Sequence, residues 1–145
     1  MWYEAHGDGC QKKVIQNSDG TWTCEKCNAN VENCDRRYLV TSTFIDDSGQ
    51  AWISSFNEHA TQFLGNVSAN DLAAYKEEVE NEDGKFEDYM RQFNFKQYHV
   101  KIRVKSEVWN EQTRVKSNIV AMTPLDGEEL VRHSRCMIDA IHALG

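Results

Sequence analysis

Alternating apolar and polar positions predict two β-hairpins in this chain. Residues 36–46 (RRYLVTSTFID) and 51–56 (AWISSF) are rich in β-branched and aromatic residues, and DDSGQ forms the turn between them. Apolar and basic residues alternate over 98–108 (YHVKIRVKSEV), and WNEQ turns the chain into a further strand over 113–122. We expect this second hairpin to bury one face, which contains Tyr98, Val100, Ile102, Val104, Val108, Val115, Ile119 and Ala121.

The segment between the two hairpins has the residue pattern of helices. Residues 58–65 predict a short helix that ends at Gly65, and residues 86–93 predict another. Between them, Ser68 and Asp71 form a capping pattern before a helix with a single apolar stripe. The stripe contains Leu72, Tyr75 and Val79.

The last segment, 127–144, has the pattern of a helix that packs against another helix. Its seam positions are spaced alternately by four and three, as in a coiled coil: Leu130, Ser134, Met137, Ile141 and Leu144, widened by Val131 and Ile138. The seam fits either the chain's own barrel or a partner helix. The heptad spacing and terminal position favour a partner, so we expect a subunit interface formed by Leu130, Met137, Ile138, Ile141 and Leu144.

The order of these elements predicts a mainly β domain, a small barrel followed by a terminal helix. The chain has 145 residues, 40% apolar and 27% charged, which suits a single domain over 1–145. No apolar run approaches the roughly 20 residues of a membrane span, and the N-terminus lacks the regions of a signal peptide. We therefore expect no membrane partner and a reducing compartment, in which clustered cysteines act as metal ligands or reactive thiols.

Charge is unevenly distributed along the chain. The net charge of -7, taken alone, argues against nucleic-acid binding. However, residues 77–88 hold seven acids and one lysine, whereas residues 91–116 hold seven bases and two acids. The mean charge can therefore hide a basic face on the second hairpin.

Cysteines and a histidine gather near the N-terminus in a pattern typical of a zinc ribbon over 6–34. The expected ligands are His6, Cys10, Cys24 and Cys27. The last two form a C-x2-C pair, and a hairpin-length spacer that turns at 17–20 brings the two halves together. Thiolates with an imidazole favour Zn²⁺ over magnesium or calcium. Cys34 is the alternative to His6, and Cys136 is expected to be a buried apolar residue.

Four protein ligands would complete the coordination shell of this zinc, which predicts one structural ion and no enzymatic activity. A catalytic zinc keeps a position open for water and has a base nearby. The H-x-E and P-C-x-x-C pattern of zinc deaminases is absent. A zinc hydrolase is the enzyme alternative, and it requires an open coordination position.

Several segments of the chain together resemble a known family. They are CQKKVI, DGTWTCEKC, RRYLVTSTFIDDSGQAWISSF, FLG and VKSEVWNEQTRVKSNIV. In this order they are similar to the C-terminal DNA-binding domain of the large subunit of replication protein A, over nearly the whole chain. The resemblance implies a five-stranded OB-fold barrel with an inserted zinc ribbon. It also implies single-stranded DNA binding in nuclear DNA replication, repair and recombination, and a C-terminal helix that joins two smaller OB-fold subunits in a heterotrimer.

The resemblance assigns DNA-binding roles to two aromatic and two basic residues. Phe56 on the barrel face and Trp109 at the polar tip VWNEQT match aromatics that stack on bases. Arg114 and Lys116, beside that tip, match basic residues suited to phosphate contacts. Trp52 is taken as scaffold. A solvated strand face explains three further bases equally well: Lys101, Arg103 and Lys105.

The chain departs from the family in two places. His6 stands where the family has a cysteine, while Cys10, Cys24 and Cys27 match its other three ligands. The family also has a strand before the ribbon, and this chain starts at MWYEA, so we expect the first barrel strand to be missing. An open edge tends to pair with another chain. The alternatives for function are an assembly-only module and a specialised meiotic or telomeric paralogue.

Overall fold

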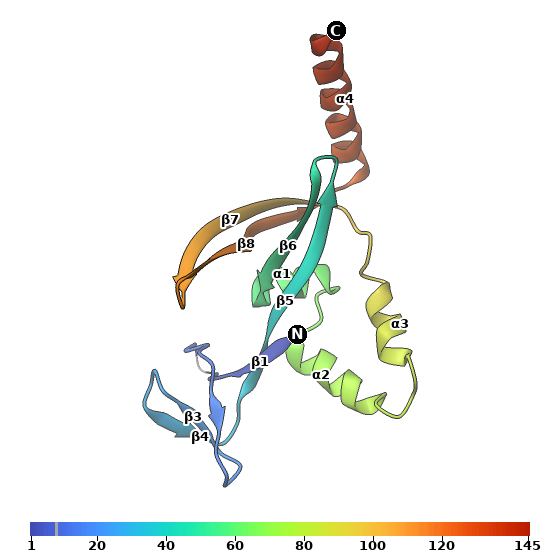
Figure 1. The fold of residues 1–145 in the computed structure, drawn as a ribbon. Helices are drawn as coiled ribbons and strands as arrows, with labels where there is room; N and C mark the ends of the chain where they lie inside the picture. Colours follow the sequence, from blue (N-terminus) through green and yellow to red (C-terminus); the bar gives the residue numbers. More distant parts are fainter. Residues whose placement is uncertain (8) are drawn as a thin grey trace.

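The chain folds into two β-sheets and a set of helices (Figure 1). The computed structural model describes residues 1–7 and 9–145, apart from the side chain of Trp109. The strands are β1 (Trp2–Ala5), β2 (Ile15–Gln16), β3 (Trp22–Cys24), β4 (Ala29–Val31), β5 (Asp35–Asp46), β6 (Gly49–Phe56), β7 (Tyr98–Trp109) and β8 (Gln112–Pro124). The helices are α1 (Asn57–Phe63), α2 (Ala69–Glu78), α3 (Lys85–Arg91) and α4 (Gly127–Leu144).

The main sheet has five strands in the order β1-β5-β6-β8-β7, and the sheet β2-β3-β4 is inserted between β1 and β5. The predicted hairpins β5–β6 and β7–β8 are confirmed. In the first, the Asp46 carboxylate accepts hydrogen bonds from the N–H groups of Ser48 and Gly49, which fixes the predicted turn. The mainly β prediction is therefore correct.

The expectation that the first strand is missing is wrong. β1 precedes the inserted sheet and pairs with β5, from Trp2 opposite Tyr38 to Ala5 opposite Asp35. Four residues give too short an apolar pattern for recognition from sequence. Within residues 1–7 and 9–145 no ladder joins β1 to β7, so the sheet stays open between its two edge strands.

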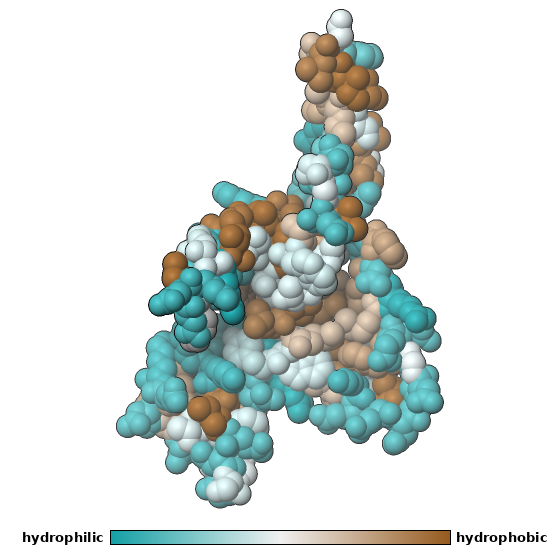
Figure 2. Space-filling model, in the orientation of Figure 1, coloured by the Kyte–Doolittle hydropathy of each residue, from teal (hydrophilic) through white to brown (hydrophobic). Residues whose placement is uncertain are grey.

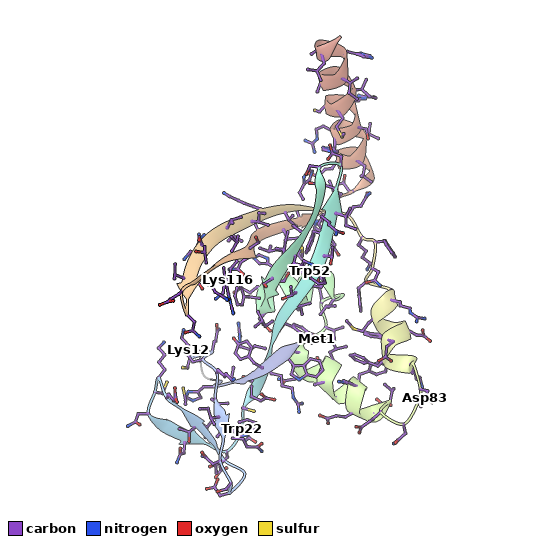
Figure 3. All side chains as sticks on the ribbon, in the orientation of Figure 1. Met1, Lys12, Trp22, Trp52, Asp83 and Lys116 are labelled. Atoms are coloured by element: carbon purple, nitrogen blue, oxygen red, sulfur yellow. The ribbon has the colours of Figure 1, made fainter. Side chains whose placement is uncertain are left out.

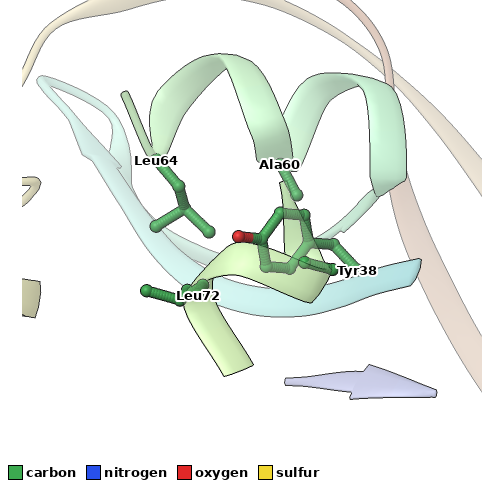
Figure 4. Packing of buried hydrophobic residues seen from close by; sticks show 5 residues of the cluster. Tyr38, Ala60, Leu64 and Leu72 are labelled. Atoms are coloured by element: carbon green, nitrogen blue, oxygen red, sulfur yellow. The ribbon is translucent and has the colours of Figure 1, made fainter. Parts of the chain in front are cut away.

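The main core lies where β5 meets α1 and α2 (Figure 4). Tyr38 is fully buried there, among Ala60, Leu64, Ala69 and Leu72. Its hydroxyl lies 3.2 Å from the Val67 carbonyl oxygen and 3.0 Å from that of Ser68. Burial raises the pKa of Tyr38 to about 12. This tyrosine therefore ties the start of α2 to the main sheet as a neutral donor.

The predicted cap and stripe of α2 are confirmed. The Ser68 hydroxyl oxygen accepts from the Asp71 N–H at 3.1 Å and donates to the Asp71 carboxylate at 2.6 Å. Leu72 and Val79 are buried, and Tyr75 is half-buried. The helix therefore packs through the face that its sequence marks as apolar.

A smaller core lies between β6 and the inner half of the β7–β8 hairpin. It contains Ile53, Ile119 and Met122, with Phe44, Tyr98 and Val100 packed against them. The ladder shifts register between Lys101 and Ile102, which leaves Val120 as an extra residue on β8. This bulge lets Ile119 and Met122 reach the same core although they are three residues apart.

Beyond the bulge, the prediction of one buried face is wrong. Val104, Val108 and Val115 are each more than half exposed, and Ile102 is 41% exposed. On the inner side of the bulge, Ala121 pairs with Lys101 on the other face and is exposed as well. β7 and β8 curve away from β5 and β6 as a two-stranded arm (Figure 1), so the arm's apolar side has no layer of the described chain to pack against.

α4 has the range that its sequence predicts, and it stands apart from the sheet (Figure 1). The Asp126 carboxylate caps it by accepting from the Glu129 N–H at 2.8 Å. The helix buries none of its residues, and Cys136, expected to be buried, is exposed for that reason. Among the described residues, no helix combines the length and apolarity needed to cross a membrane.

Candidate functional site

The segment with the inserted sheet places its potential metal ligands on two tight turns. In the first turn, which follows β1, the Cys10 N–H donates to the Gly7 carbonyl at 3.1 Å, with His6 at its start. In the second, Cys24 ends β3, and Cys27 lies in the turn that leads to β4. Each turn therefore offers two ligands, as the knuckles of a zinc ribbon do.

The four predicted ligands converge. His6, Cys10, Cys24 and Cys27 each offer one atom, and these atoms lie within 4.8 Å of one another. Cys10 Sγ is 3.8 Å from Cys24 Sγ and 3.2 Å from Cys27 Sγ. Two thiolates at about 2.3 Å from a tetrahedral zinc are about 3.8 Å apart. The cluster could therefore bind a metal ion, and its donor set suits zinc.

Of the two alternatives for the fourth ligand, His6 is the one that joins the cluster. Its Nδ1 atom is buried and has no hydrogen-bond partner, a costly state that a bound cation would relieve. Cys34 lies outside the group that the described residues form. Burial raises the pKa of the Cys34 thiol, which disfavours the thiolate that a metal requires.

A hydrogen bond joins two of the thiols. The Cys27 thiol donates to Cys10 Sγ, and this hydrogen bond lowers the pKa of Cys10. The same contact raises the pKa of Cys27 to about 11. A divalent cation would take the place of this proton and allow both sulfurs to ionise.

The outer face of β6 displays two aromatic side chains. Side chains alternate along a strand, so Ile53 and Ser55 face the core, while Trp52 and Phe56 point outward. Trp52 is 71% exposed and Phe56 is 49% exposed. The sequence predicts Trp52 to be scaffold, but most of its side chain is exposed. Neighbouring side chains on a strand point to opposite faces, so the burial of Ile53 leaves Trp52 on the outer face.

The register of the sheet joins this aromatic strand to the basic hairpin. Ser54, between the two aromatics, lies opposite Asn118 of β8, and Asn118 lies opposite Arg103 of β7. Directly paired residues point to the same side of a sheet. Counting by two along each strand defines one aromatic–basic face, which contains Trp52, Phe56, Lys101, Arg103, Lys105, Arg114 and Lys116, together with Glu107.

The basic part of this face contains a repulsive pair. Lys105 and Lys116 lie directly opposite each other on β7 and β8, an arrangement that destabilises a sheet. Lys116 Nζ lies 2.6 Å from Glu107 Oε2, and Lys116 lowers the pKa of that carboxyl. Natural proteins tolerate a local conflict of this kind at functional sites. Figure 3 labels Lys116 on the arm and Trp52 on β6.

Trp109 stands where its sequence context predicts, at the end of the arm. Its backbone closes β7 before a two-residue turn at Asn110 and Glu111, whose φ angles of 48° and 62° match a hairpin turn of the primed type. The side chain of Trp109 lies outside the described part of the chain. Its stacking role therefore stays a prediction.

The predicted seam of α4 is open to solvent. Leu130 is half-buried, and exposure rises along the seam from 37% at Met137 to 90% at Leu144. Ile138 and Ile141 lie between them and are also exposed. Figure 2 shows hydrophobic residues gathered on this projecting helix. The seam is therefore not packed on the chain's own sheet.

Comparison with known proteins points to one family. Residues 1–133 match the family model of the replication factor-A C-terminal domain. The chain is 35% identical over 119 residues to replication factor A protein 1 of Saccharomyces cerevisiae, which covers 82% of this chain and 18% of that protein. It is 34% identical over 124 residues to the 70 kDa DNA-binding subunit of replication protein A from Drosophila melanogaster. That match covers 86% of this chain and 20% of that protein. The chain thus spans about a fifth of the length of these relatives.

Solved structures agree with the family match. A replication protein A heterotrimer bound to ssDNA matches with a TM-score of 0.83 at 31% identity, covering 98% of this chain and 31% of that one. Yeast RPA bound to ssDNA matches with a TM-score of 0.77 at 30% identity, covering 96% and 77%. The OB-fold prediction is confirmed by these neighbours. The chain belongs to the replication factor-A C-terminal domain family.

Proposed function

We propose that this chain binds single-stranded DNA as part of a replication protein A-like large subunit. The observation that carries the proposal is the aromatic–basic face, on which exposed Trp52 and Phe56 share one side of the sheet with five basic side chains. Aromatic rings stack on unpaired bases, and basic side chains neutralise phosphates. A single strand laid across β6 and the arm meets both kinds of group.

This face favours single strands over duplex and is tolerant of sequence. Stacking requires a base whose flat side is free, and every base has such a side. In a duplex those sides are covered by neighbouring base pairs. Because the basic side chains attract the phosphates electrostatically, binding weakens as salt is added.

Titration of a labelled oligo-dT, followed by fluorescence anisotropy, tests the proposal. Phe56→Ala and Trp109→Ala should each weaken binding by about 1–3 kcal/mol, a range taken from single-strand binders that include replication protein A itself. Phe95→Ala is the matched control, because Phe95 is a fully exposed aromatic in the loop before β7, outside the aromatic–basic face. Absence of detectable binding at low salt would contradict the proposal.

We also propose that His6, Cys10, Cys24 and Cys27 hold one structural Zn²⁺. Four ligands leave no position for a reacting water, which favours a structural over a catalytic ion. Among the described residues 6–7 and 9–34, only Val14 and Cys24 are buried apolar residues, too few to hold the ribbon without a metal.

Zinc content and amide exchange test the ribbon. Chelation should release one zinc and expose the amides of β2, β3 and β4 while those of β5 and α2 stay protected. His6→Ala should weaken zinc binding, and Cys34→Ala should leave it unchanged. A ribbon that keeps its protection after chelation would rule out the structural role.

We propose that α4 joins helices of two smaller OB-fold subunits in a heterotrimer, and that this complex works in the nucleus in DNA replication, repair and recombination. The open seam supports this role, as does the likeness to a replication protein A heterotrimer. An assembly-only module is the second candidate, which the same seam favours. Ile141→Asp should abolish assembly of the heterotrimer and spare DNA binding, and Phe56→Ala should do the reverse. Loss of assembly alone, with no DNA binding by the unmodified chain, would favour the second candidate.

A further inference from the structure

A cavity of about 410 Å³ lies on the far side of the main core from the β7–β8 arm, between β1, α2 and α3. Its lining includes Trp2 from β1, Ala73 and Val79 from α2 and its end, and Phe86 from α3. The Phe86 ring packs against the Tyr75 ring, and their centroids are 6.5 Å apart. Part of the cavity's lining is therefore apolar and aromatic.

The ammonium group of Lys76 already lies in this cavity. Lys76 Nζ is 5.8 Å from the ring centroid of Trp2 and 5.7 Å from that of Phe86. These distances are within the range of cation–π attraction, and two rings act on the same ammonium. Lys76 itself is exposed, so its side chain is free to leave the rings. The two rings thus form a place that receives a basic side chain.

The rim of the cavity is strongly acidic. Its carboxylates belong to Glu77, Glu80, Glu82, Asp83 and Glu87, against Lys76 as the one base of the lining. Arg36 pairs with Glu77 and Lys85 with Glu82, but in the described part of the chain no ion pair involves the other three. α2 ends at this rim, so its C-terminal carbonyls add further negative potential.

We infer that this cavity docks a basic segment of a partner protein, with a lysine or arginine side chain entering between Trp2 and Phe86 in place of Lys76. Charge complementarity selects the occupant, because the rim repels phosphates and attracts cations. The walls add an apolar contact for the stem of a long basic side chain. The cavity is formed by β1, α2 and α3, whereas the aromatic–basic face lies on β6, β7 and β8. The inference therefore does not depend on the proposed DNA binding.

Anisotropy titration of the zinc-loaded 145-residue chain into a short fluorescein-labelled arginine-rich peptide tests the inference. Glu80→Gln together with Asp83→Asn should weaken binding roughly fivefold. The matched control, Asp47→Asn with Glu58→Gln, removes the same charge from exposed positions elsewhere and should weaken it less than about twofold. Equal losses in both pairs, or no binding at all, would overturn the inference.

Two further variants separate the cavity from general charge attraction. Lys76→Ala should strengthen peptide binding, because it vacates the rings, and by more than Lys13→Ala, which removes the same charge from the ribbon. Trp2→Leu keeps an apolar side chain against the core but loses the ring, and it should weaken binding about threefold. If Lys76→Ala and Lys13→Ala act alike, or if Glu80→Gln with Asp83→Asn changes self-association of the chain instead, the inference fails.

Discussion

The burial of helices α2 and α4 is the opposite of what their sequences suggest. α4 separates apolar from polar residues more sharply than α2 does, yet α4 buries nothing, while α2 buries Ala69, Leu72 and Ala73. The difference is in the neighbours: α2 lies against β5 and the Tyr38 cluster, whereas α4 stands apart from the sheet (Figures 1 and 4). An apolar stripe thus shows that a helix has a face to bury, and tertiary structure decides whether the chain itself supplies the cover.

The largest effect is expected from truncating the covered helix. Leu72→Ala should lower the free energy of unfolding by about 2–5 kcal/mol, because it opens a cavity beside Tyr38. Ile141→Ala, on the uncovered helix, should change it by less than about 0.5 kcal/mol. Urea denaturation of the zinc-loaded chain measures both. Similar losses would mean that α4 packs on its own domain in solution, and the comparison would break.

The next effect concerns assembly. Ile141→Asp should cost the heterotrimer at least about 2 kcal/mol, because a buried unpaired charge would replace an apolar contact. Cys136→Asp adds the same charge to the opposite side of α4, at an exposed position, and should have little effect. Co-purification with the two smaller subunits is the measurement. Equal loss in both variants would place the interface elsewhere on the helix.

Sequence patterns predicted those parts of the molecule whose structure is set locally. The range of α4, the Ser68 cap and the converging ligands follow from spacing along the chain alone. The exposure of Val104 and of Trp52 could not be predicted in that way. Both faces of a strand have the same local geometry, and only the strand's partners and the bulge at Val120 decide which face is covered.

A smaller effect extends the comparison from helices to the sheet. Trp52→Ala should weaken oligo-dT binding by about 1–2 kcal/mol and leave stability nearly unchanged, because the ring is 71% exposed. Ile45→Ala removes a similarly exposed aliphatic side chain from β5 and should leave binding nearly unchanged, since it has no ring to stack. Anisotropy and thermal unfolding report the two properties. A large loss of stability would show that Trp52 is scaffold after all.

The smallest effect tests the repulsive pair on the arm. Glu107 holds Lys116 by an ion pair at 2.6 Å, and incoming phosphate has to displace that carboxylate. Glu107→Gln should therefore strengthen oligo-dT binding by about two- to threefold, a surface-pair effect. Glu111→Gln removes the same charge from the same hairpin without freeing Lys116, and should strengthen it less. Since Lys116 lowers the pKa of Glu107, the carboxyl is ionised on both sides of neutral pH, and the gain should not vary there. If both variants strengthen DNA binding equally, release of Lys116 has no specific effect. The arm would then attract DNA only through its overall positive charge.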